Sequence, residues 1–589
     1  MISRIKLTAS VVSAILTLAS CGGSDSNGTP AASASPPASA PPAASAPVAA
    51  SGPSAQDTLA TTTPIKHVVV IFQENVSFDH YFGTYPIAGN PSSPAELPFI
   101  PAANTPAVNN LILPGTTVKT SPLLTNNPNL NANNGAGAHN PFRLDRTQAL
   151  TADQSHGYKN EQSAFDAVAN PAAPLMDLFP AFTGRAVTLS GGSGPFFTTG
   201  LVLGFFDGNT VTALWNYAQN FAMSDSYFAT TFGSSTQGAI NLVSGQTNGV
   251  VTTAASGSAM DDGTGTGSKT LMSDIPPTGD ACSGTGTTGL MTSKNIGDLL
   301  NAAGVTWGSF QAGFDLTKTN PNGTTGCQRS SFSNVVGGYI PDYDPEHASF
   351  QYYKSTQNTA HTRPSSTALI GTSGDGANHD YDLDDFFTAV KAGNFPSVSF
   401  LKAPNARTGH SGTSDPLSEQ TFLVNTVNFL EKQPDWANTA VFITYDDSDG
   451  WYDNVAHVVN PSFSTSDSLS GTNSCRSTVA GGPATPLPGV NGLPANGRCG
   501  YGPRLPLIAI SPFAKRNFVD STVTDQTSLI RFVEDNWLGG QRIGQGSFDA
   551  IAGPLTNMFD FSASQPTPQL ILDPNSGALP GAQAALAGQ

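Results

Sequence analysis

The sequence predicts an α/β fold built on a mainly parallel sheet that is covered by helices on both faces. Two observations support this prediction: four short apolar runs are typical of buried strands, and helix-like stretches alternate with them. Strands that alternate with helices pair in the same direction, because each helix returns the chain to the same end of the sheet. In such sheets the chemistry lies just beyond the carboxyl ends of the strands. The residues directly after each strand are therefore the first candidates for function.

The expected strands share a continuous run of aliphatic, β-branched or aromatic residues. They are 67–72 (HVVVIF), 398–401 (VSFL), 440–444 (AVFIT) and 505–510 (LPLIAI). The expected helices lie before, between and after the later strands. They are 212–227, 236–243, 384–391, 419–432 and 528–535.

The N-terminal region is expected to direct export. Arg4 and Lys6 precede an apolar run, 11–18, that is too short to span a bilayer. The run ends in Leu18-Ala19-Ser20-Cys21, which resembles the lipobox of bacterial lipoproteins, in which the Cys carries lipid. The alternative is an ordinary signal peptide with a chance Cys.

We therefore expect three parts in the chain. Residues 1–20 form a lipoprotein-type signal peptide, and residues 21–56, rich in Ala, Pro and Ser, form a tether. Residues 57–589 form the folded catalytic domain. A lipid on Cys21 would anchor the protein to a membrane, and Gly22 after it favours the outer membrane, with the enzyme periplasmic or on the cell surface.

Composition restricts the partners. The net charge is −17 and only 11% of residues are charged, so a non-specific nucleic-acid binder is not expected. An acidic surface also repels anionic substrates, and an enzyme acting on them would need a local positive centre such as a metal ion.

The remaining cysteines are expected to form disulfides in an oxidising compartment. Three connectivities are possible, and the most local one pairs Cys282 with Cys327 and Cys475 with Cys499.

Acidic and amide side chains come directly after two of the predicted strands. The first strand leads into Glu74 and Asn75, and the strand at 440–444 leads into Asp446 and Asp447. Carboxylates crowded at one sheet edge repel each other, and a divalent cation removes that cost. Oxygen ligands suit Mg²⁺, Ca²⁺ or Mn²⁺, without excluding Zn²⁺. The alternative for the second segment is a plain turn, because Asp and Gly are common in turns.

A third segment, 232–238 (FGSSTQG), is a Gly-rich turn that opens a helix-like stretch. Such a turn exposes a hydroxyl at a helix start, where backbone N–H groups favour phosphate. The alternative is an ordinary Ser or Thr cap. Three consecutive hydroxyl residues, Ser234, Ser235 and Thr236, leave the nucleophile open at this point.

Residues 66–83 (KHVVVIFQENVSFDHYFG) resemble the opening motif of the bacterial phosphoesterase family. That family includes phosphocholine-preferring phospholipases C and the acid phosphatase A group, which share an alkaline-phosphatase-like α/β/α sandwich. The usual form is ENRSFDHYFG, so Val76 replaces an Arg. The resemblance continues through 225–245, 350–353, 415–428, 445–455 and 502–537.

The resemblance implies the roles of the site residues. Glu74, Asn75, Asp446 and Asp447 match the ligands of one divalent metal ion (Ca, Mg, Mn or Zn), and Ser235 matches the metal-bound nucleophile. Ser235 is chosen because the family places Ser or Thr second after the Gly of this turn. Phospholipase C members tend to have Thr followed by Asn-Pro-Asn-Arg, and usually carry added C-terminal β-domains. The Ser and the early end of the chain favour the phosphatase branch.

Four histidines are candidates for protonating the leaving alcohol: His156, His347, His379 and His410. Each lies in a polar, Gly-rich loop that matches a family segment lining the pocket, and two or three of them are expected in the site. Glu346 and Ser521 stand where the family often has His, which is expected to affect substrate choice.

The expected activity is metal-dependent hydrolysis of phosphate monoesters through a phosphoserine intermediate. One alternative is a phospholipase C that cleaves phosphodiester lipids, so the substrate is a small phosphate ester or a phospholipid. A second alternative is a non-catalytic surface lipoprotein that retains the fold.

Overall fold

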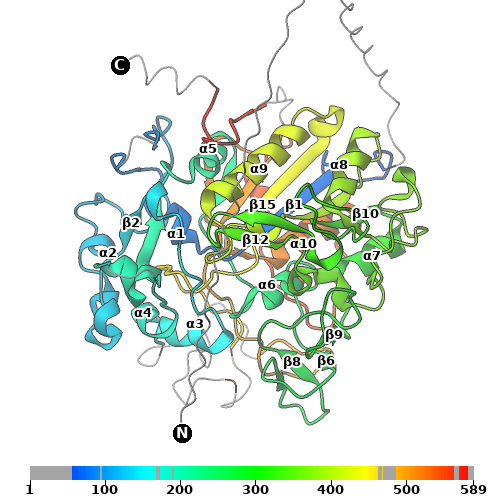
Figure 1. Cartoon of the computed structure of the whole chain (residues 1–589), viewed down its shortest axis with the longest axis horizontal. Coiled ribbons are helices and arrows are strands. Elements are labelled where there is room, and N and C mark those ends of the chain that lie inside the picture. The colour runs from blue at the N-terminus through cyan, green and yellow to red at the C-terminus, as the bar shows by residue number, and fades with distance from the viewer. Residues whose placement is uncertain are drawn as a thin grey trace, which may run out of the picture. The chain divides into compact units, whose positions relative to one another are not determined.

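A computed structural model of the protein describes residues 56–92, 96–167, 173–188, 192–461, 467, 486–562 and 569–580. An eight-stranded sheet forms its centre (Figure 1). Its strands, in spatial order, are β13 (Asp380–Asp382), β10 (Trp307–Gln311), β14 (Val398–Lys402), β1 (His67–Gln73), β15 (Thr439–Tyr445), β16 (Leu507–Ile510), β4 (Ala222–Ser224) and β17 (Phe518–Asp520).

The sheet is mainly parallel, as predicted. β13, β10, β14, β1 and β15 are parallel neighbours. β16 pairs antiparallel with both β15 and β4, and β17 pairs parallel with β4, so β16 alone in this sheet runs in the opposite direction. All seven residues of β1 are buried, because strands lie on both sides of it and helices cover both faces of the sheet.

Helices cover both faces of the sheet. Along β10, Trp307 and Phe310 are three residues apart and therefore point to opposite faces. Phe310 meets Phe386 of α8 (Leu383–Lys391) at a ring distance of 5.3 Å. The ring of Trp307 lies directly against Gly297 of α7 (Ile296–Ala303), where an added Cβ would stand 2.4 Å from it.

The other large helices extend these two layers. Phe442 of β15 lies in the same cross-strand row as Ser309, and thus on the Trp307 face. Its ring lies 5.4 Å from Phe532 of α10 (Thr527–Trp537). On the opposite face, α9 (Pro416–Leu430) packs beside α8 through Phe429 and Phe387, and α5 (Thr212–Asn220) contacts α9. The predicted layering of helix, sheet and helix is confirmed.

The remaining elements form the surroundings of the sheet. The additional helices are α1 (Phe78–Phe82), α2 (Pro122–Thr125), α3 (Tyr158–Phe165), α4 (Phe179–Phe182) and α6 (Ser235–Asn241). The paired short strands are β2 (Phe142–Leu144) with β3 (Gly204–Phe206), β5 (Tyr227–Phe228) with β18 (Thr524–Asp525), β6 (Val250–Thr252) with β9 (Gly289–Met291), β7 (Ala259–Asp261) with β8 (Lys269–Leu271), and β11 (Ser330–Ser333) with β12 (Gly338–Pro341).

One predicted element extended too far. The expected helix 212–227 ends at Asn220, and the chain then enters β4, a strand of the central sheet. The apolar residues of this stretch fit both a helix and a strand. They form a strand because they pair with β16 and β17. The other four helices and all four strands are present, with ends that differ by a few residues.

The Cys282–Cys327 disulfide is present, as predicted. The other predicted pairing involves Cys475, which lies outside the described residues, as do Cys21, the signal segment and nearly all of the tether. The division of the chain at residues 20 and 56 stays a prediction.

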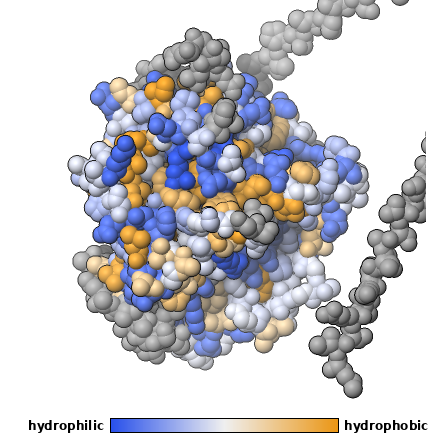
Figure 2. Space-filling model, turned by 60° about the vertical axis from the view of Figure 1, so that its left-hand side comes forward, coloured by the Kyte–Doolittle hydropathy of each residue, from blue (hydrophilic) through white to orange (hydrophobic). Residues whose placement is uncertain are grey.

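The visible surface mixes hydrophobic and hydrophilic side chains. Figure 2 shows hydrophobic residues interspersed with hydrophilic ones on one face of the molecule. None of the helices in the part of the chain that the structure describes combines the length and the apolar character needed to cross a bilayer.

Candidate active site

The carboxyl ends of β1 and β15 lie side by side, with Gln73 opposite Tyr445. The next residues of each strand therefore meet, and the Asn75 backbone N–H donates to Asp446 Oδ1 at 3.1 Å. The four predicted ligands, Glu74, Asn75, Asp446 and Asp447, are each at most 2% exposed. The structure brings them together at one edge of the sheet, where the sequence placed them.

Ser235 is the first residue of α6, and its hydroxyl faces these acids. Its Oγ donates to Asp447 Oδ2 at 2.7 Å and lies 3.2 Å from Asn75 Oδ1. The two neighbouring hydroxyl residues have other roles. Ser234 is the N-cap of α6, and the Thr236 hydroxyl donates to the Glu346 carbonyl at 3.2 Å. Among the three hydroxyl residues that the sequence left open, the geometry directs Ser235 to the carboxylates.

The turn before Ser235 depends on glycine. Gly233 has φ 129°, a conformation that side chains other than glycine rarely adopt. A Cβ at this position would also stand 2.1 Å from Gln237 Oε1, which accepts from the Ser234 backbone N–H.

Two cations face Glu74. Its Oε1 lies 2.5 Å from Lys402 Nζ and 3.0 Å from His347 Nδ1, while Oε2 accepts from the Thr408 hydroxyl at 3.1 Å. The contacts of Glu74 Oε1 with Lys402 and His347 are ion pairs, but their geometry does not meet the angles of a hydrogen bond. Burial alone would raise the pKa of Glu74, but the charges of His347 and Lys402 hold it well below its usual value. Although burial opposes it, Glu74 in turn raises the pKa of His347 to about 10.

Asn75 contacts a second carboxylate–histidine pair, Asp449 and His156. Asp449 Oδ1 accepts from Asn75 Nδ2 at 3.2 Å and from the Gln154 backbone N–H at 3.1 Å, and lies 3.0 Å from His156 Nδ1. Burial disfavours a charged His156, but Asp447 and Asp449 outweigh it and raise its pKa well above the usual value. Burial raises the pKa of Asp449 to about 6, and His156 opposes that rise.

Three of the four predicted histidines converge on the site. His156 and His347 pair with Asp449 and Glu74, and the pKa of His410 is raised, against its burial, chiefly by the charges of Glu74 and Asp449. The sequence predicted two or three of the four in the site, and His379 is the candidate that lies outside it.

The His379 ring stacks on Trp307 at 4.2 Å, and its Nδ1 bonds the Trp307 carbonyl at 2.9 Å. Burial lowers its pKa to about 4, so His379 is a neutral side chain that packs on the sheet. The physical reason is that its loop leads directly into β13, whose neighbour in the sheet is β10, the strand that carries Trp307.

The donor set fits a divalent cation. Asp446 Oδ2 and Asp449 Oδ2 are buried and have no hydrogen-bond donor among the described residues. Burial and the adjacent Asp447 carboxylate raise the pKa of Asp446 to about 7, because this position disfavours an uncompensated negative charge. Carboxylate, amide and hydroxyl oxygens together are ligands typical of Mg²⁺, Ca²⁺ or Mn²⁺.

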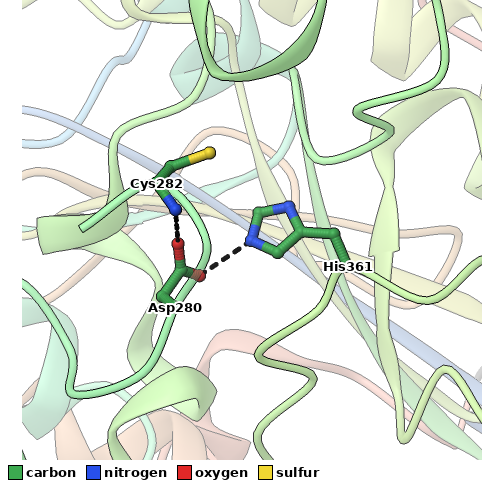
Figure 3. A group of neighbouring side chains, drawn as sticks. All are labelled: Asp280, Cys282 and His361. Carbon is green, nitrogen blue, oxygen red and sulfur yellow. Dashed lines mark hydrogen bonds and ion pairs between the residues drawn. The ribbon is translucent and has the colours of Figure 1, made fainter. Parts of the chain in front are cut away.

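A second group of side chains has the residue types of a metal site, but its sulfur and carboxylate atoms already have other partners. Figure 3 shows Asp280 between Cys282 and His361, with the Cys282 sulfur on the far side from the carboxylate. That sulfur is bonded to Cys327, and Asp280 Oδ2 already accepts from the Tyr343 hydroxyl at 2.8 Å and lies 2.9 Å from His361 Nε2. This group is a buried hydrogen-bond network that holds the disulfide loop.

Sequence reasoning missed four residues at the site: Lys402, Thr408, Asp449 and Glu161. Lys402 is the last residue of β14, so the rule that selected Glu74 and Asp446 could have found it. Asp449 lies two residues after Asp447 in the segment already singled out. Glu161 comes from α3, and no local pattern connects it to the site.

Comparison with known proteins points to one family. Residues 65–538 match the model of the phosphoesterase family. A non-hemolytic phospholipase C of Burkholderia pseudomallei is 31% identical over 273 residues, which are 45% of this chain and 35% of that one. A non-hemolytic phospholipase C of Pseudomonas aeruginosa is 31% identical over 32% of this chain and 27% of its own length. The chain thus spans about a third or less of these two relatives.

A more distant relative matches over a longer stretch. Phospholipase C A of Mycobacterium tuberculosis is 22% identical over 528 residues, 88% of this chain and 82% of that one. Among solved structures, a protein in the alkaline phosphatase superfamily from Vibrio parahaemolyticus is 12% identical with a TM-score of 0.24, covering 64% of this chain and 81% of that one. At this TM-score the likeness adds nothing to what the sheet topology shows.

Lys402 offers a test of the charge balance. Lys402→Met should lower the free energy of unfolding by about 3 kcal/mol in the presence of a chelator, because a buried Glu74 then loses one of its two cations. Lys391→Met is the matched control. Lys402 Nζ lies over the Phe72 ring at 4.9 Å, and Lys391 Nζ lies over the Phe429 ring at 5.5 Å. Lys391 is exposed, so its loss should change stability by less than about 0.5 kcal/mol. Urea denaturation measures both, and equal small losses would show that Glu74 does not need Lys402.

Proposed function

The chain belongs to the phosphoesterase family, and we propose that it hydrolyses phosphate monoesters through a phosphoserine intermediate on Ser235. The observation that carries the proposal is the 2.7 Å hydrogen bond from Ser235 Oγ to Asp447 Oδ2, inside a buried group of oxygen ligands. A buried hydroxyl next to a carboxylate and several histidines has the parts that nucleophilic attack on phosphorus requires.

One divalent cation would be held by Glu74, Asn75, Asp446, Asp447 and Ser235. When bound, it would supply positive charge beside the nucleophile and a phosphoryl oxygen, in a protein whose net charge of −17 otherwise repels phosphate.

The first displacement transfers the phosphoryl group to serine. Ser235 Oγ attacks phosphorus in line, and its proton moves to Asp447 Oδ2, the carboxylate oxygen that already accepts it. Burial raises the pKa of Asp447, although the positive charge of His156 opposes the rise.

The departing alcohol needs a proton as its bond to phosphorus breaks. His156 is the first candidate, because Asp447 and Asp449 raise its pKa and so keep its imidazolium charged. His410 and His347 are neighbouring alternatives. In the second displacement, water attacks the phosphoserine and passes a proton to the histidine that protonated the alcohol. Asp447 returns its proton to the departing Ser235 oxygen, which restores the hydroxyl, and phosphate is the product.

A phospholipase C is the second candidate, and the names of the relatives favour it. Its substrate would be a phosphodiester lipid rather than a monoester, and the same residues would act. The sequence Ser235-Thr236-Gln237-Gly238 supports the monoester reading, because phospholipase C members of the family tend to have Thr-Asn-Pro-Asn-Arg in this region.

We also propose that the protein is exported and held on the outer membrane by a lipid on Cys21. The lipobox-like segment supports the anchor, and the Cys282–Cys327 disulfide supports an oxidising compartment.

Ser235→Ala should reduce turnover of an aryl phosphate to background, because no other hydroxyl in the turn faces Asp447. Thr236→Ala is the matched control, since its hydroxyl bonds the Glu346 carbonyl. It should keep activity within about fivefold, a loss typical of one peripheral hydrogen bond. Initial rates with saturating Mn²⁺, and the melting temperature of each variant, would check this. A Ser235→Ala enzyme with near-normal turnover would remove the nucleophile from the proposal.

The two candidate functions differ in the substrate they accept. The proposal predicts that kcat/KM for a simple aryl phosphate exceeds that for an aryl phosphocholine by at least about tenfold, because a diester carries one oxygen charge fewer into the cationic site. Both substrates should be assayed with Mg²⁺, Ca²⁺, Mn²⁺ and Zn²⁺ from pH 4 to 9. The reverse preference would replace the monoesterase with the phospholipase C.

A further inference from the structure

Glu161 is a buried acid of α3 that the mechanism above does not use. We propose that Glu161 is a positioning residue, which fixes the turn carrying Ser235 against the loop carrying Asp447. The kinetic part of this inference rests on the proposed function.

The Glu161 carboxylate joins two segments that are far apart in sequence. Its Oε2 accepts from the Gly233 backbone N–H at 2.9 Å, and its Oε1 accepts from the Ser448 hydroxyl at 2.5 Å. Gly233 is two residues before Ser235, and Ser448 is the residue after Asp447. One side chain, only 1% exposed, therefore binds the backbone turn before Ser235 and the residue after Asp447.

Helix α3 contacts the same turn a second time. The ring of Phe165 meets that of Phe232 edge to face, with 4.9 Å between ring centres. Glu161 and Phe165 are four residues apart and so project from the same side of the helix. Phe232 and Gly233 are adjacent in the turn, so a polar and an apolar contact from one helix face fix two consecutive residues.

The hydrogen bond between Glu161 and Ser448 also orders the loop that carries Asp447. The Ser448 hydroxyl, while donating to Glu161, accepts from the Gly450 backbone N–H at 2.9 Å. This orders the tight bend in which Asp449 has φ 55° and in which the Asp449 backbone N–H donates to Asp447 Oδ1 at 2.6 Å. The Asp447 carboxylate is thus aligned toward Ser235 by a chain of bonds that begins at Glu161.

Loss of this contact should affect the chemistry more than substrate binding. Without Glu161, the Gly233 N–H and the Ser448 hydroxyl would be buried without an acceptor, and the two segments would move to find new partners. A displacement of about 1 Å between nucleophile and acceptor can cost about 10²-fold in rate. The two hydrogen bonds of Glu161 go to Gly233 and Ser448, neither of which is a predicted cation ligand.

The test compares Glu161→Leu with Glu161→Gln. Leucine removes both acceptors at similar volume, whereas glutamine keeps one oxygen. Glu431→Leu is the matched control, because Glu431 is equally buried and accepts from the Leu570 backbone N–H at 2.6 Å, away from the site. The readouts are kcat and KM for an aryl phosphate with Mn²⁺, and hydrogen exchange of the amides in residues 233–241.

The proposal predicts that Glu161→Leu lowers kcat by about 10²-fold with KM within about threefold, and speeds exchange in 233–241. Glu161→Gln should recover kcat to within about tenfold of wild type, since it restores one of the two bonds. Glu431→Leu should leave kcat and the 233–241 exchange unchanged.

Unchanged exchange in 233–241 for Glu161→Leu would overturn the inference, and so would equal effects of the leucine variants at 161 and 431 on kcat. If the wild-type protein had no phosphoesterase activity, the proposed function would fail, and the exchange measurement alone would still decide the role of Glu161.

Discussion

The constraint on which the rest of the structure depends is the burial of four carboxylates at one place. Glu74, Asp446, Asp447 and Asp449 are almost wholly removed from solvent, and none could stay ionised there without compensation. Lys402 and three histidines supply part of it, as the pKa shifts of Glu74 and His156 show. Asp446 and Asp449 each keep an oxygen that has no donor within the described ranges, and a divalent cation would satisfy these oxygens.

The sheet order explains how these charges come together. β1 lies between β14 and β15, so Lys402, Glu74 and Asp446 leave three adjacent strands at the same edge. The backbone then turns sharply at Asn75 and Asp449, both with positive φ, which places their side chains across from each other. A rigid scaffold of buried strands can hold such unfavourable groups in place, because its stability comes from the apolar layers on either side.

Much of the fold, and the meeting of acidic side chains at one sheet edge, could be predicted from the sequence, because both depend on short local patterns. Buried strands are continuous apolar runs, and the residues after each run lie at the sheet edge; this rule brought Glu74 and Asp446 together correctly. His379 shows the limit of the same reasoning, since a histidine in a polar, Gly-rich loop looks alike whether it faces a pocket or stacks on Trp307. Glu161 shows another limit, because its partners are about 70 and 290 residues away, and only the packing of α3 makes them neighbours.

In the proposed mechanism, Ser235 carries the phosphoryl group between two displacements. The most direct measurement is mass spectrometry of peptides from enzyme quenched in acid during turnover of an aryl phosphate. We expect phosphate on the peptide that contains Ser235, with fragment ions that place it on that residue and not on Ser234 or Thr236. Phosphate on a histidine or on another hydroxyl, or active enzyme in which no phosphopeptide accumulates under any quench time or metal, would contradict it.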